Sequence, residues 1–303
     1  MFKKDYAYKD GIYVYPTNDK TLDKIQNFYQ DDPFPNYEHD DDRSRIQQRG
    51  DSNSYTLNLK KFIGYGKKII EIGSGTCQLS NYLAIGTNNT LVALDGNLNS
   101  LKLGQKFSEK NGIKNIHFVC ADIFDDRIEN STFDFVICNG VLHHTKNSFD
   151  AYSSCLKLLK KDGYILIGLY NSIGRIRTKF RSLLYKFFGK KYLMFFDPVL
   201  RKINTQSAKK IDAWIKDQYI HPVERSHSFD EILNWFKKTK IKFVNSYPSC
   251  DFFKNVETEN YLQNLFNQGV EANFFERVLS QIQMIFTRPG SEGGLFFFLG
   301  KKE

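Results

Sequence analysis

The sequence is poor in the residue patterns that mark metal, redox or disulfide-bonded proteins. Its five cysteines form no CxxC pair, and four of them fall within apolar segments that read as core strands or helices. We interpret them as small buried side chains in a reducing compartment, which argues against a disulfide scaffold and a cysteine zinc site. These cysteines are Cys77, Cys120, Cys138, Cys155 and Cys250.

Long apolar runs and repeats are also missing. No segment approaches the roughly 20 apolar residues that a membrane-spanning helix needs. The first ten residues, MFKKDYAYKD, contain no apolar signal region. No internal repeat of solenoid length is evident. We therefore expect a soluble, cytoplasmic, globular protein.

What the chain does contain suits a packed core. Hydrophobic residues make up 41% and aromatic residues 15% of the 303 residues, unlike a disordered chain. This length allows one large domain with sizeable additions. The net charge of +9 permits nucleic acid, phosphorylated metabolites or lipid headgroups as partners. Because the lysines are scattered, charge alone does not select among these partners.

Short apolar strands alternate with amphipathic helical patterns through residues 67–170, which predicts parallel strands joined by crossover helices. The strands are apolar almost throughout, as in a sheet that is covered on both faces. We therefore predict an α/β fold with a doubly wound, Rossmann-like sheet of seven strands. The strands are expected at 67–72, 90–95, 115–122, 132–139, 164–170, 240–247 and 293–302, with helices beginning near Gln78, Leu98 and Phe149.

The remaining segments divide the chain into four parts. Residues 1–60 are acidic around Asp31–Asp42 and rich in tyrosine, and we expect an N-terminal cap outside the sheet. Residues 61–172 form the cofactor-binding core, and 173–227 a basic helical insertion that acts as a lid. Residues 228–303 complete the core, with a further helical insertion at 249–292 because that stretch is too long for a tight hairpin.

The segment EIGSGTC, residues 71–77, places two glycines where the first core strand turns into its helix. Glycine at such a turn lets the backbone approach a ligand, although a plain structural turn would also use it. The dinucleotide-binding fingerprint requires a third glycine, and Gln78 stands at that position.

Polar side chains end the following strands at the same edge of the predicted sheet. Asp95 ends the second strand, where a carboxylate can accept both hydrogen bonds of a ribose diol. Asp122 ends the third strand within reach of an adenine amino group, and Asn139 and Gly140 end the fourth. An aspartate at a strand end is also a common turn residue, so the indication comes from their convergence.

These motifs resemble the class I S-adenosylmethionine-dependent methyltransferases. The matching stretches are EIGSGT, LD at 94–95, AD at 121–122 and NGVLHH at 139–144. The resemblance implies an antiparallel final strand, and S-adenosylmethionine as the cofactor. It departs at Cys77, where glycine is frequent and where we expect the small cysteine to be tolerated. The implied cofactor-binding residues are Glu71, Gly73, Ser74 and Gly75 at the methionine end, Asp95 and Gly96 at the ribose, Asp122 and Ile123 at the adenine, and Asn139 beside the sulfonium.

A longer resemblance, to an unnamed bacterial subgroup of this family, extends over nearly the whole chain. It depends on the stretches PFPNY (33–37), CQLSNYL (77–83), GVLHHT (140–145), IGLYN (167–171), DQYIHPVERSH (217–227) and EGGLFFFLG (292–300). No substrate is known for that subgroup, so this resemblance supports the fold and the cofactor but does not indicate an acceptor.

Several residues near this edge could assist methyl transfer, since an amine or phenol acceptor needs a base near neutrality. We predict catalytic roles for His144, His143 and Glu224, although either histidine could equally pack against the following loop. The predicted substrate-binding residues are Tyr170, Asn171, Arg175, His221 and His227. A metal site is not expected, because Pro222 breaks the helical register and a fourth ligand is missing.

The segment 174–202 contains nine Lys or Arg residues against one acid, Asp197. Its apolar residues form one helical stripe, and Gly189 is expected to end that helix. We favour a lid whose apolar face turns inward over the pocket. An interfacial helix on an anionic membrane, serving a lipid-linked acceptor, and an RNA contact are the alternatives. The stripe is Ile176, Phe180, Leu183, Leu184 and Phe187.

The sequence thus predicts a cytoplasmic S-adenosylmethionine-dependent methyltransferase. We expect the acceptor to be an oxygen or nitrogen of a small molecule, a glycan or a lipid-linked precursor, with nucleic acid not favoured. The rival functions are a tRNA or RNA methyltransferase, a nicotinamide-dependent oxidoreductase, and a catalytically silent Rossmann-like protein that binds RNA or membrane. The intact set of Gly73, Gly75, Asp95 and Asp122 argues against a silent protein.

Overall fold

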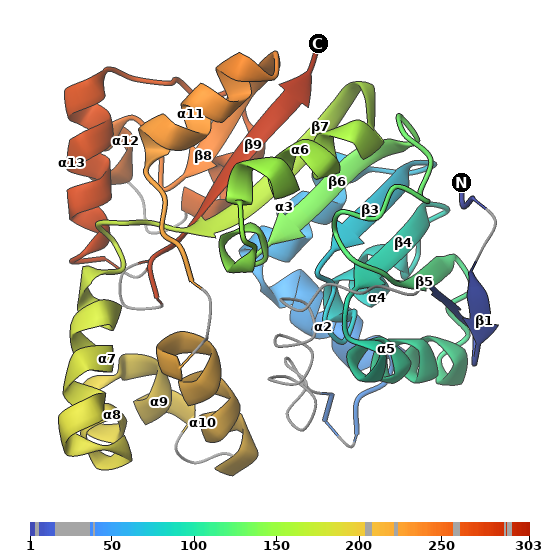
Figure 1. The fold of residues 1–303 in the computed structure, drawn as a ribbon, viewed down its shortest axis with the longest axis horizontal. Helices are drawn as coiled ribbons and strands as arrows, with labels where there is room; N and C mark the ends of the chain where they lie inside the picture. The colour runs from blue at the N-terminus through green and yellow to red at the C-terminus, as the bar shows by residue number, and fades with distance from the viewer. Residues whose placement is uncertain are drawn as a thin grey trace.

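The computed structural model describes one nine-stranded sheet with helices on both faces (Figure 1). Its strand order is β1-β2-β5-β4-β3-β6-β7-β9-β8. The described residues are 1–3, 6–15, 37–38, 40–203, 208–220, 224–256, 261–287, 289 and 293–303. The strands are β1 Ala7–Lys9, β2 Ile12–Val14, β3 Lys68–Ile72, β4 Thr90–Asp95, β5 Ile116–Cys120, β6 Phe133–Asn139, β7 Leu159–Tyr170, β8 Ile241–Tyr247 and β9 Leu295–Lys302.

The predicted doubly wound α/β fold is confirmed. Strands β3 to β7 are mutually parallel, and β9 lies antiparallel between β7 and β8. All seven expected strands are present. Strand β7 begins earlier than expected, at Leu159, because this buried residue pairs with Phe133 of β6.

The prediction that the N-terminal region forms a cap outside the sheet is wrong for its first strands. Strands β1 and β2 form an antiparallel hairpin, and β2 pairs in parallel with β5, so two strands extend the edge of the sheet. Each has only three residues, and β1 is exposed along its whole length. Strands this short show no alternation of apolar and polar residues that could identify them in the sequence.

Alternate residues of the central strands pack into two separate hydrophobic cores, one on each face of the sheet. In β3, Ile69 faces the core formed with α2, α3, α4, α5 and η3, whereas Ile70 faces the core formed with α6, α11 and α13. This period of two is why the strands are apolar on both sides. The helices are α2 Arg43–Ser52, α3 Ser54–Ile63, α4 Gln78–Ala84, α5 Leu98–Lys110, α6 Ser148–Leu158, α11 Phe229–Lys238, α12 Phe252–Val256, η3 Tyr261–Phe266 and α13 Phe274–Met284.

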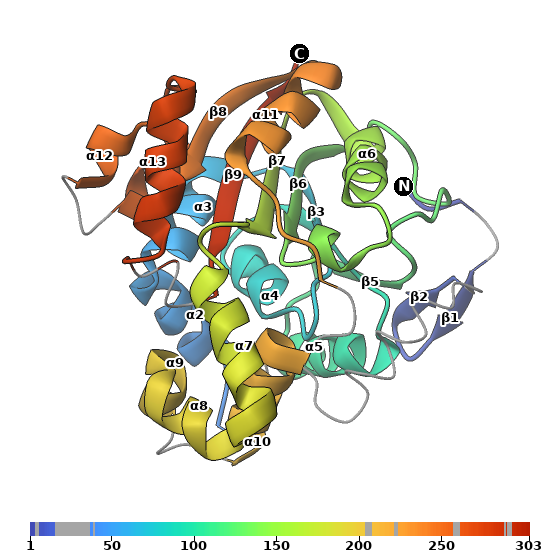
Figure 2. The same ribbon diagram turned by 60° about the vertical axis from the view of Figure 1, so that its left-hand side comes forward.

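The basic insertion forms a helical lobe that extends from the carboxyl end of β7 (Figures 1 and 2). It contains α7 Ile176–Phe188, α8 Lys190–Phe196, α9 Pro198–Ile203, α10 Ala208–Ile215 and the π-helix η2 Lys216–Ile220. As expected, α7 ends at Gly189, which has a φ of +70°. The lobe has a small core of its own, made of Leu193, Leu200, Ile211, Ile215 and Tyr219.

The orientation of α7 contradicts the expected inward lid. Four residues of its apolar stripe are 49–75% exposed, and the residues that α7 buries are Thr178 and Arg181. The spacing of apolar residues identifies an apolar face, but it does not identify what covers that face. The exposed residues of the stripe are Ile176, Phe180, Leu183 and Phe187.

Candidate functional site

The parallel core strands bring the predicted cofactor-binding residues to one edge of the sheet. In register, Ile72 lies beside Leu94, and Asp95 lies beside Cys120. The strand residues before this edge are buried, whereas most of the residues just beyond it are partly exposed. These partly exposed residues, which we call the rim, are Gly73, Gly75, Asp95, Gly96, Asp122, Ile123, Asn139 and Gly140.

The glycine loop is packed tightly between β4 and the segment after β6. The N–H groups of Gly73 and Ser74 both donate to the Leu94 carbonyl, at 2.8 and 3.0 Å. Gly73 has a φ of +73°, and a Cβ there would lie 2.0 Å from Val141 Cγ2. Only glycine fits this position, so the backbone itself lines the rim here.

Asp95 is fixed by the backbone of the same loop. The Gly75 N–H donates to Oδ2 at 2.8 Å, and the Asn97 N–H donates to Oδ1 at 2.7 Å. Burial raises the pKa of Asp95, and these two backbone donors oppose that shift. Each carboxylate oxygen can accept a second hydrogen bond, so Asp95 can bind two neighbouring hydroxyl groups at once.

Glu71 lies buried at the end of β3. Its carboxylate accepts a hydrogen bond from the Ser80 hydroxyl of α4. Burial raises the pKa of Glu71 to about 7, although the hydrogen bonds from Ser80 lower it. A carboxyl group with this pKa changes its charge in the neutral pH range.

Asn139 presents an unsatisfied acceptor close to the rim. Its Nδ2 donates to the Tyr55 hydroxyl at 2.6 Å, whereas its Oδ1 is buried and has no hydrogen-bond partner among the described residues. A buried acceptor without a donor costs free energy unless a ligand satisfies it. The glycine cradle, the Asp95 carboxylate and this Asn139 oxygen therefore fit the ribose diol and the amino group of S-adenosylmethionine.

Tyr55 was missed in the sequence because it lies in α3, outside every motif of the core. Its ring stacks on Phe297 of β9, with 5.1 Å between ring centroids. Tyr37 ends the stretch PFPNY, of which residues 33–36 lie outside the described residues. The Tyr37 hydroxyl donates to the Thr76 carbonyl and accepts from Asn81, both at 2.9 Å.

Asp122 follows β5 as predicted, and its Oδ1 accepts from the Phe124 N–H at 2.9 Å. This bond is the turn role that an aspartate at a strand end commonly has. The contact of Asp122 with adenine stays a prediction.

The two predicted catalytic histidines lie inside a packed aromatic cluster. His143 is fully buried, and its ring centroid lies 4.1 Å from those of both His144 and Tyr170. The Arg225 N–H donates to the His143 carbonyl at 2.9 Å, which ties the returning end of the insertion to this loop. The packing role is therefore visible for His143, and catalysis by His144 stays a prediction.

The contacts of Arg175 and Glu224 differ from the roles that we predicted for these two residues. The buried Arg175 guanidinium forms a two-point ion pair with Glu224, with Nε to Oε1 at 2.6 Å. It also donates to the Gly293 carbonyl and lies 3.5 Å from the centre of the Tyr170 ring. An arginine that is fully occupied in this way cannot also bind a substrate anion, and Glu224 is its counter-ion rather than a free base.

Asn171 and His227 also have structural partners. The Asn171 Oδ1 accepts from the N–H groups of Ile173 and Gly174, and its Nδ2 donates to Gln281. His227 Nε2 lies 3.1 Å from Ser148 Oγ, on the side of α6 and α11. These bonds hold the end of β7 in place, so a substrate contact is not supported for either residue. His221 lies outside the described residues.

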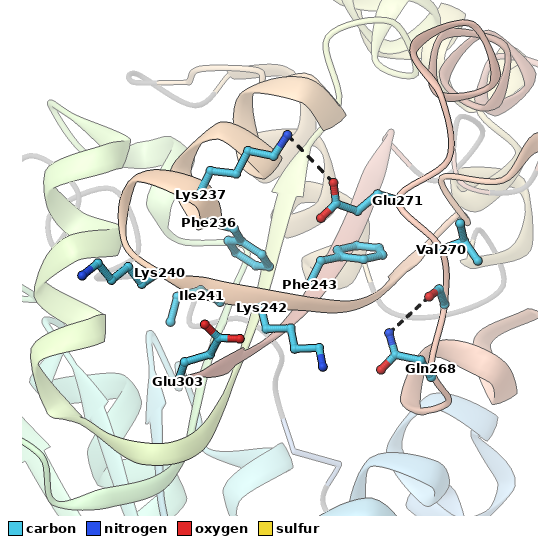
Figure 3. Close-up of a pocket in the computed structure, with 11 residues that line it drawn as sticks. Phe236, Lys237, Lys240, Ile241, Lys242, Phe243, Gln268, Val270, Glu271 and Glu303 are labelled. Carbon is cyan, nitrogen blue, oxygen red and sulfur yellow. Dashed lines mark hydrogen bonds and ion pairs between the residues drawn. The ribbon is translucent and has the colours of Figure 1, made fainter.

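A surface pocket at the other end of the sheet is unrelated to this rim. It lies along β8, where Lys240, Lys242 and Phe243 contribute to its wall together with Gln268 and Glu303 (Figure 3). β8 runs parallel to β7, so Lys240 and Ile241 mark the amino ends of the strands. The described residues contain no group of three potential metal ligands and no helix long and apolar enough to cross a membrane.

This core is similar in sequence and in fold to known proteins. A family model described as a methyltransferase domain matches residues 63–191. An uncharacterized protein of Synechococcus sp. is 23% identical over 198 residues, covering 58% of this chain and 48% of its own length. The ubiquinone/menaquinone biosynthesis C-methyltransferase UbiE of Stutzerimonas stutzeri is 30% identical over 106 residues, covering 34% of this chain and 41% of that protein. The chain thus spans less than half the length of these two curated relatives.

A solved structure with a similar fold is PKMT2 from Rickettsia typhi, with a TM-score of 0.58 and 16% identity over 82% of this chain and 52% of that one. The same protein in complex with AdoHcy gives a TM-score of 0.57 and 15% identity, over 81% and 52%. The family model spans the strands whose ends form the rim. Residues 63–191 therefore match a methyltransferase domain, the solved structures share the Rossmann-like fold of this chain, and S-adenosylmethionine is the cofactor that the geometry of the rim fits.

Proposed function

We propose that the protein transfers a methyl group to an oxygen or nitrogen of a small-molecule, glycan or lipid-linked acceptor. The observation that carries this proposal is the convergence of the glycine loop, Asp95 and the unsatisfied Asn139 oxygen on one rim. The acceptor would enter from the side bounded by the β6–η1 loop (η1 is Leu142–His144) and the helical insertion.

Under this proposal, Gly73, Asp95 and Asn139 of the rim each have a role that their geometry supports. S-adenosylmethionine, when bound, supplies an electrophilic methyl group on a sulfonium. The Gly73 backbone permits close approach, Asp95 accepts from the ribose hydroxyls, and Asn139 Oδ1 accepts from the amino group. The remaining task of the protein is to align the acceptor in line and to exclude water. His144, which is 8% exposed, is the candidate to accept a proton from an acceptor that carries one.

A carbon acceptor is the second candidate. The observation that favours it is the 30% identity, over 106 residues, with a protein named as a C-methyltransferase. The position of the label in the methylated product, determined by NMR, separates carbon from oxygen and nitrogen.

The first experiment supplies methyl-labelled S-adenosylmethionine and an extract of the protein's own cells. We expect label in the small aqueous or the organic fraction. Asp95→Ala should remove it and weaken binding of S-adenosylhomocysteine about a hundredfold, because two hydrogen bonds to a charged group are lost. Calorimetric titration measures that affinity.

The matched control is Asp134→Ala. Asp134 also accepts a backbone N–H, from Lys68 at 2.8 Å, but it lies near the start of β6, at the opposite end of the sheet. Its substitution should leave the affinity for S-adenosylhomocysteine unchanged. Unchanged binding by Asp95→Ala would disprove the assigned ribose site, and label in the RNA fraction would disprove the acceptor class.

A further inference from the structure

The helical lobe exposes an apolar stripe on α7. Ile176, Phe180, Leu183 and Phe187 recur at helical spacing on one face, and each is about half exposed or more. Phe188 and Phe195 beside them are 66% and 70% exposed. Single exposed apolar residues are ordinary, but a contiguous set on one helix marks an interaction site.

Helix α13 carries a second exposed apolar stripe that adjoins the first. Phe275, Leu279 and Ile282 of α13 and Phe286, two residues after its end, are 41–79% exposed. Both helices lie on the same side of the molecule, on the left of Figure 1, and both come forward in Figure 2. The Arg177 guanidinium in the first turn of α7 donates to the Ile285 carbonyl at 3.0 Å, so the first turn of α7 lies next to the end of α13. We call the two stripes together the docking face.

Helices α7 and α8 contain basic residues and no acidic residue. Asp197, the one acid of residues 174–202, is buried and accepts hydrogen bonds from Trp214 and Tyr219. Lys190 is paired with Asp212 of α10, whereas the exposed Lys186 and Lys191 have no acidic partner in the part of the chain that the structure describes.

Glu276 directly follows Phe275, so the α13 stripe has an acid at its start, in the first turn of α13 and at the end away from α7. Helix α7 itself contains no acidic residue, and Asp212 of α10, which is about half exposed, is paired with Lys190 of α8.

The exposed apolar stripes and the basic residues together favour one of three possible partners, which are a second copy of the chain, RNA and an anionic membrane. A second copy of the chain would place like charges against one another, and RNA would leave the aliphatic residues of the stripes in water. An anionic bilayer satisfies both features, because its acyl chains accept Phe, Leu and Ile while its headgroups attract lysine. We propose that the docking face binds the surface of an anionic lipid membrane.

The position of α7 relates membrane docking to the entrance for the acceptor. α7 begins six residues after β7 ends at Tyr170, beside the edge that carries the rim. A membrane on the docking face would therefore lie near the entrance for a lipid-linked acceptor. That consequence rests on the proposed function, whereas the docking itself does not.

The test is cosedimentation of the full chain with phosphatidylcholine vesicles that either contain or lack phosphatidylglycerol. We expect about tenfold tighter binding to the anionic vesicles, falling as salt is added. Phe180→Gln with Phe187→Gln should reduce this binding at least about tenfold. The matched control is Tyr65→Gln, because Tyr65 is 71% exposed and lies in the loop between α3 and β3.

The charge is tested separately. Lys186→Glu with Lys191→Glu should weaken binding to anionic vesicles about tenfold, whereas Lys106→Glu with Lys110→Glu on α5 makes the same charge change and should have little effect. Binding of S-adenosylhomocysteine should be unchanged in all these variants, which separates this proposal from the proposed function.

Three results would overturn the docking proposal. The first is equal binding to both kinds of vesicle. The second is an equal loss of binding in the control variants. The third is that the unmodified protein does not bind vesicles, whereas Phe180→Gln with Phe187→Gln abolishes its binding to RNA or its self-association.

Discussion

Glu71 shows how burial changes one side chain of the site. Its pKa is raised from 4.5 to about 7 chiefly by burial, so the folded protein binds this proton more tightly than the unfolded chain. The resulting stabilisation is fully present below about pH 4.5 and is lost as the pH rises through about 7.

We expect Glu71→Gln to remove this pH dependence. In the ligand-free protein, the free energy of unfolding should fall with rising pH over this range, by at most about 3 kcal/mol more than in Glu71→Gln. Urea unfolding at several pH values measures the difference. Parallel pH profiles for the two proteins would show that Glu71 keeps an ordinary pKa.

The positions of the predicted cofactor-binding residues in the fold could be inferred one by one, because backbone geometry constrains them. Gly73 must be glycine where Val141 approaches, and Asp95 must end its strand to reach the Gly75 N–H. The substrate contacts could not be predicted in the same way. The sequence identifies Arg175 as a cation but does not reveal that Glu224, 49 residues later, is its partner.

At the scale of elements, the loop before α4 and the helix α5 are fitted to each other. Cys77 has a φ of +61°, a conformation that favours glycine, and its side chain is fully buried. Gly104 of α5 leaves space for the Cys77 side chain, because a Cβ at residue 104 would lie 2.6 Å from Cys77 Cβ and 2.7 Å from the Thr76 carbonyl. The cysteine that departs from the family pattern is thus tolerated because it faces a glycine.

Gly104→Ala tests this fit. Alanine improves helix propensity by about 1 kcal/mol, but crowding of a packed interior costs about 1–3 kcal/mol. We expect a net loss of about 1 kcal/mol in the free energy of unfolding, measured in urea. Asn99→Ala, at an exposed position of the same helix, is the control. A gain in stability from Gly104→Ala would show that the loop before α4 moves away from the new methyl group at little cost in free energy.

Elements were predictable where the pattern of apolar residues is long. The seven core strands were identified because both of their faces are buried, which keeps apolar residues in an unbroken run. The hairpin of β1 and β2 was missed because three residues do not establish a period. The face of α7 was misassigned because amphipathic spacing is the same whether its apolar side meets a core, a membrane or water.

At the scale of the whole molecule, one ion pair links the helical lobe to the sheet. Arg175 stands between β7 and α7, and it binds Glu224 together with the Gln218 carbonyl of η2. It also stacks on Tyr170, which in turn contacts His143. The lobe is thus anchored next to the loop that is expected to face the acceptor.

Glu224→Gln should weaken this anchor strongly. It leaves the 1% exposed Arg175 without its counter-ion, and breaking a buried pair costs about 3 kcal/mol. We expect a loss of that order in urea unfolding, together with faster proteolysis of the lobe. Asp212→Asn is the matched control, since the Lys190–Asp212 pair is about half exposed and should contribute less than about 1 kcal/mol. Equal effects of the two variants would contradict the anchoring role.

The sequence by itself determined the seven core strands and the glycine loop, because these depend on local backbone geometry and on apolar runs that the chain carries in order, and the resemblance of its motifs to a known family indicated the cofactor. The tertiary structure alone decided which distant side chains meet. It placed Tyr55 of α3 on Asn139, paired Arg175 with Glu224, and turned the apolar stripe of α7 outward. These contacts join segments far apart in the chain, and a pattern of residue types along a single strand or helix contains no information about its partner.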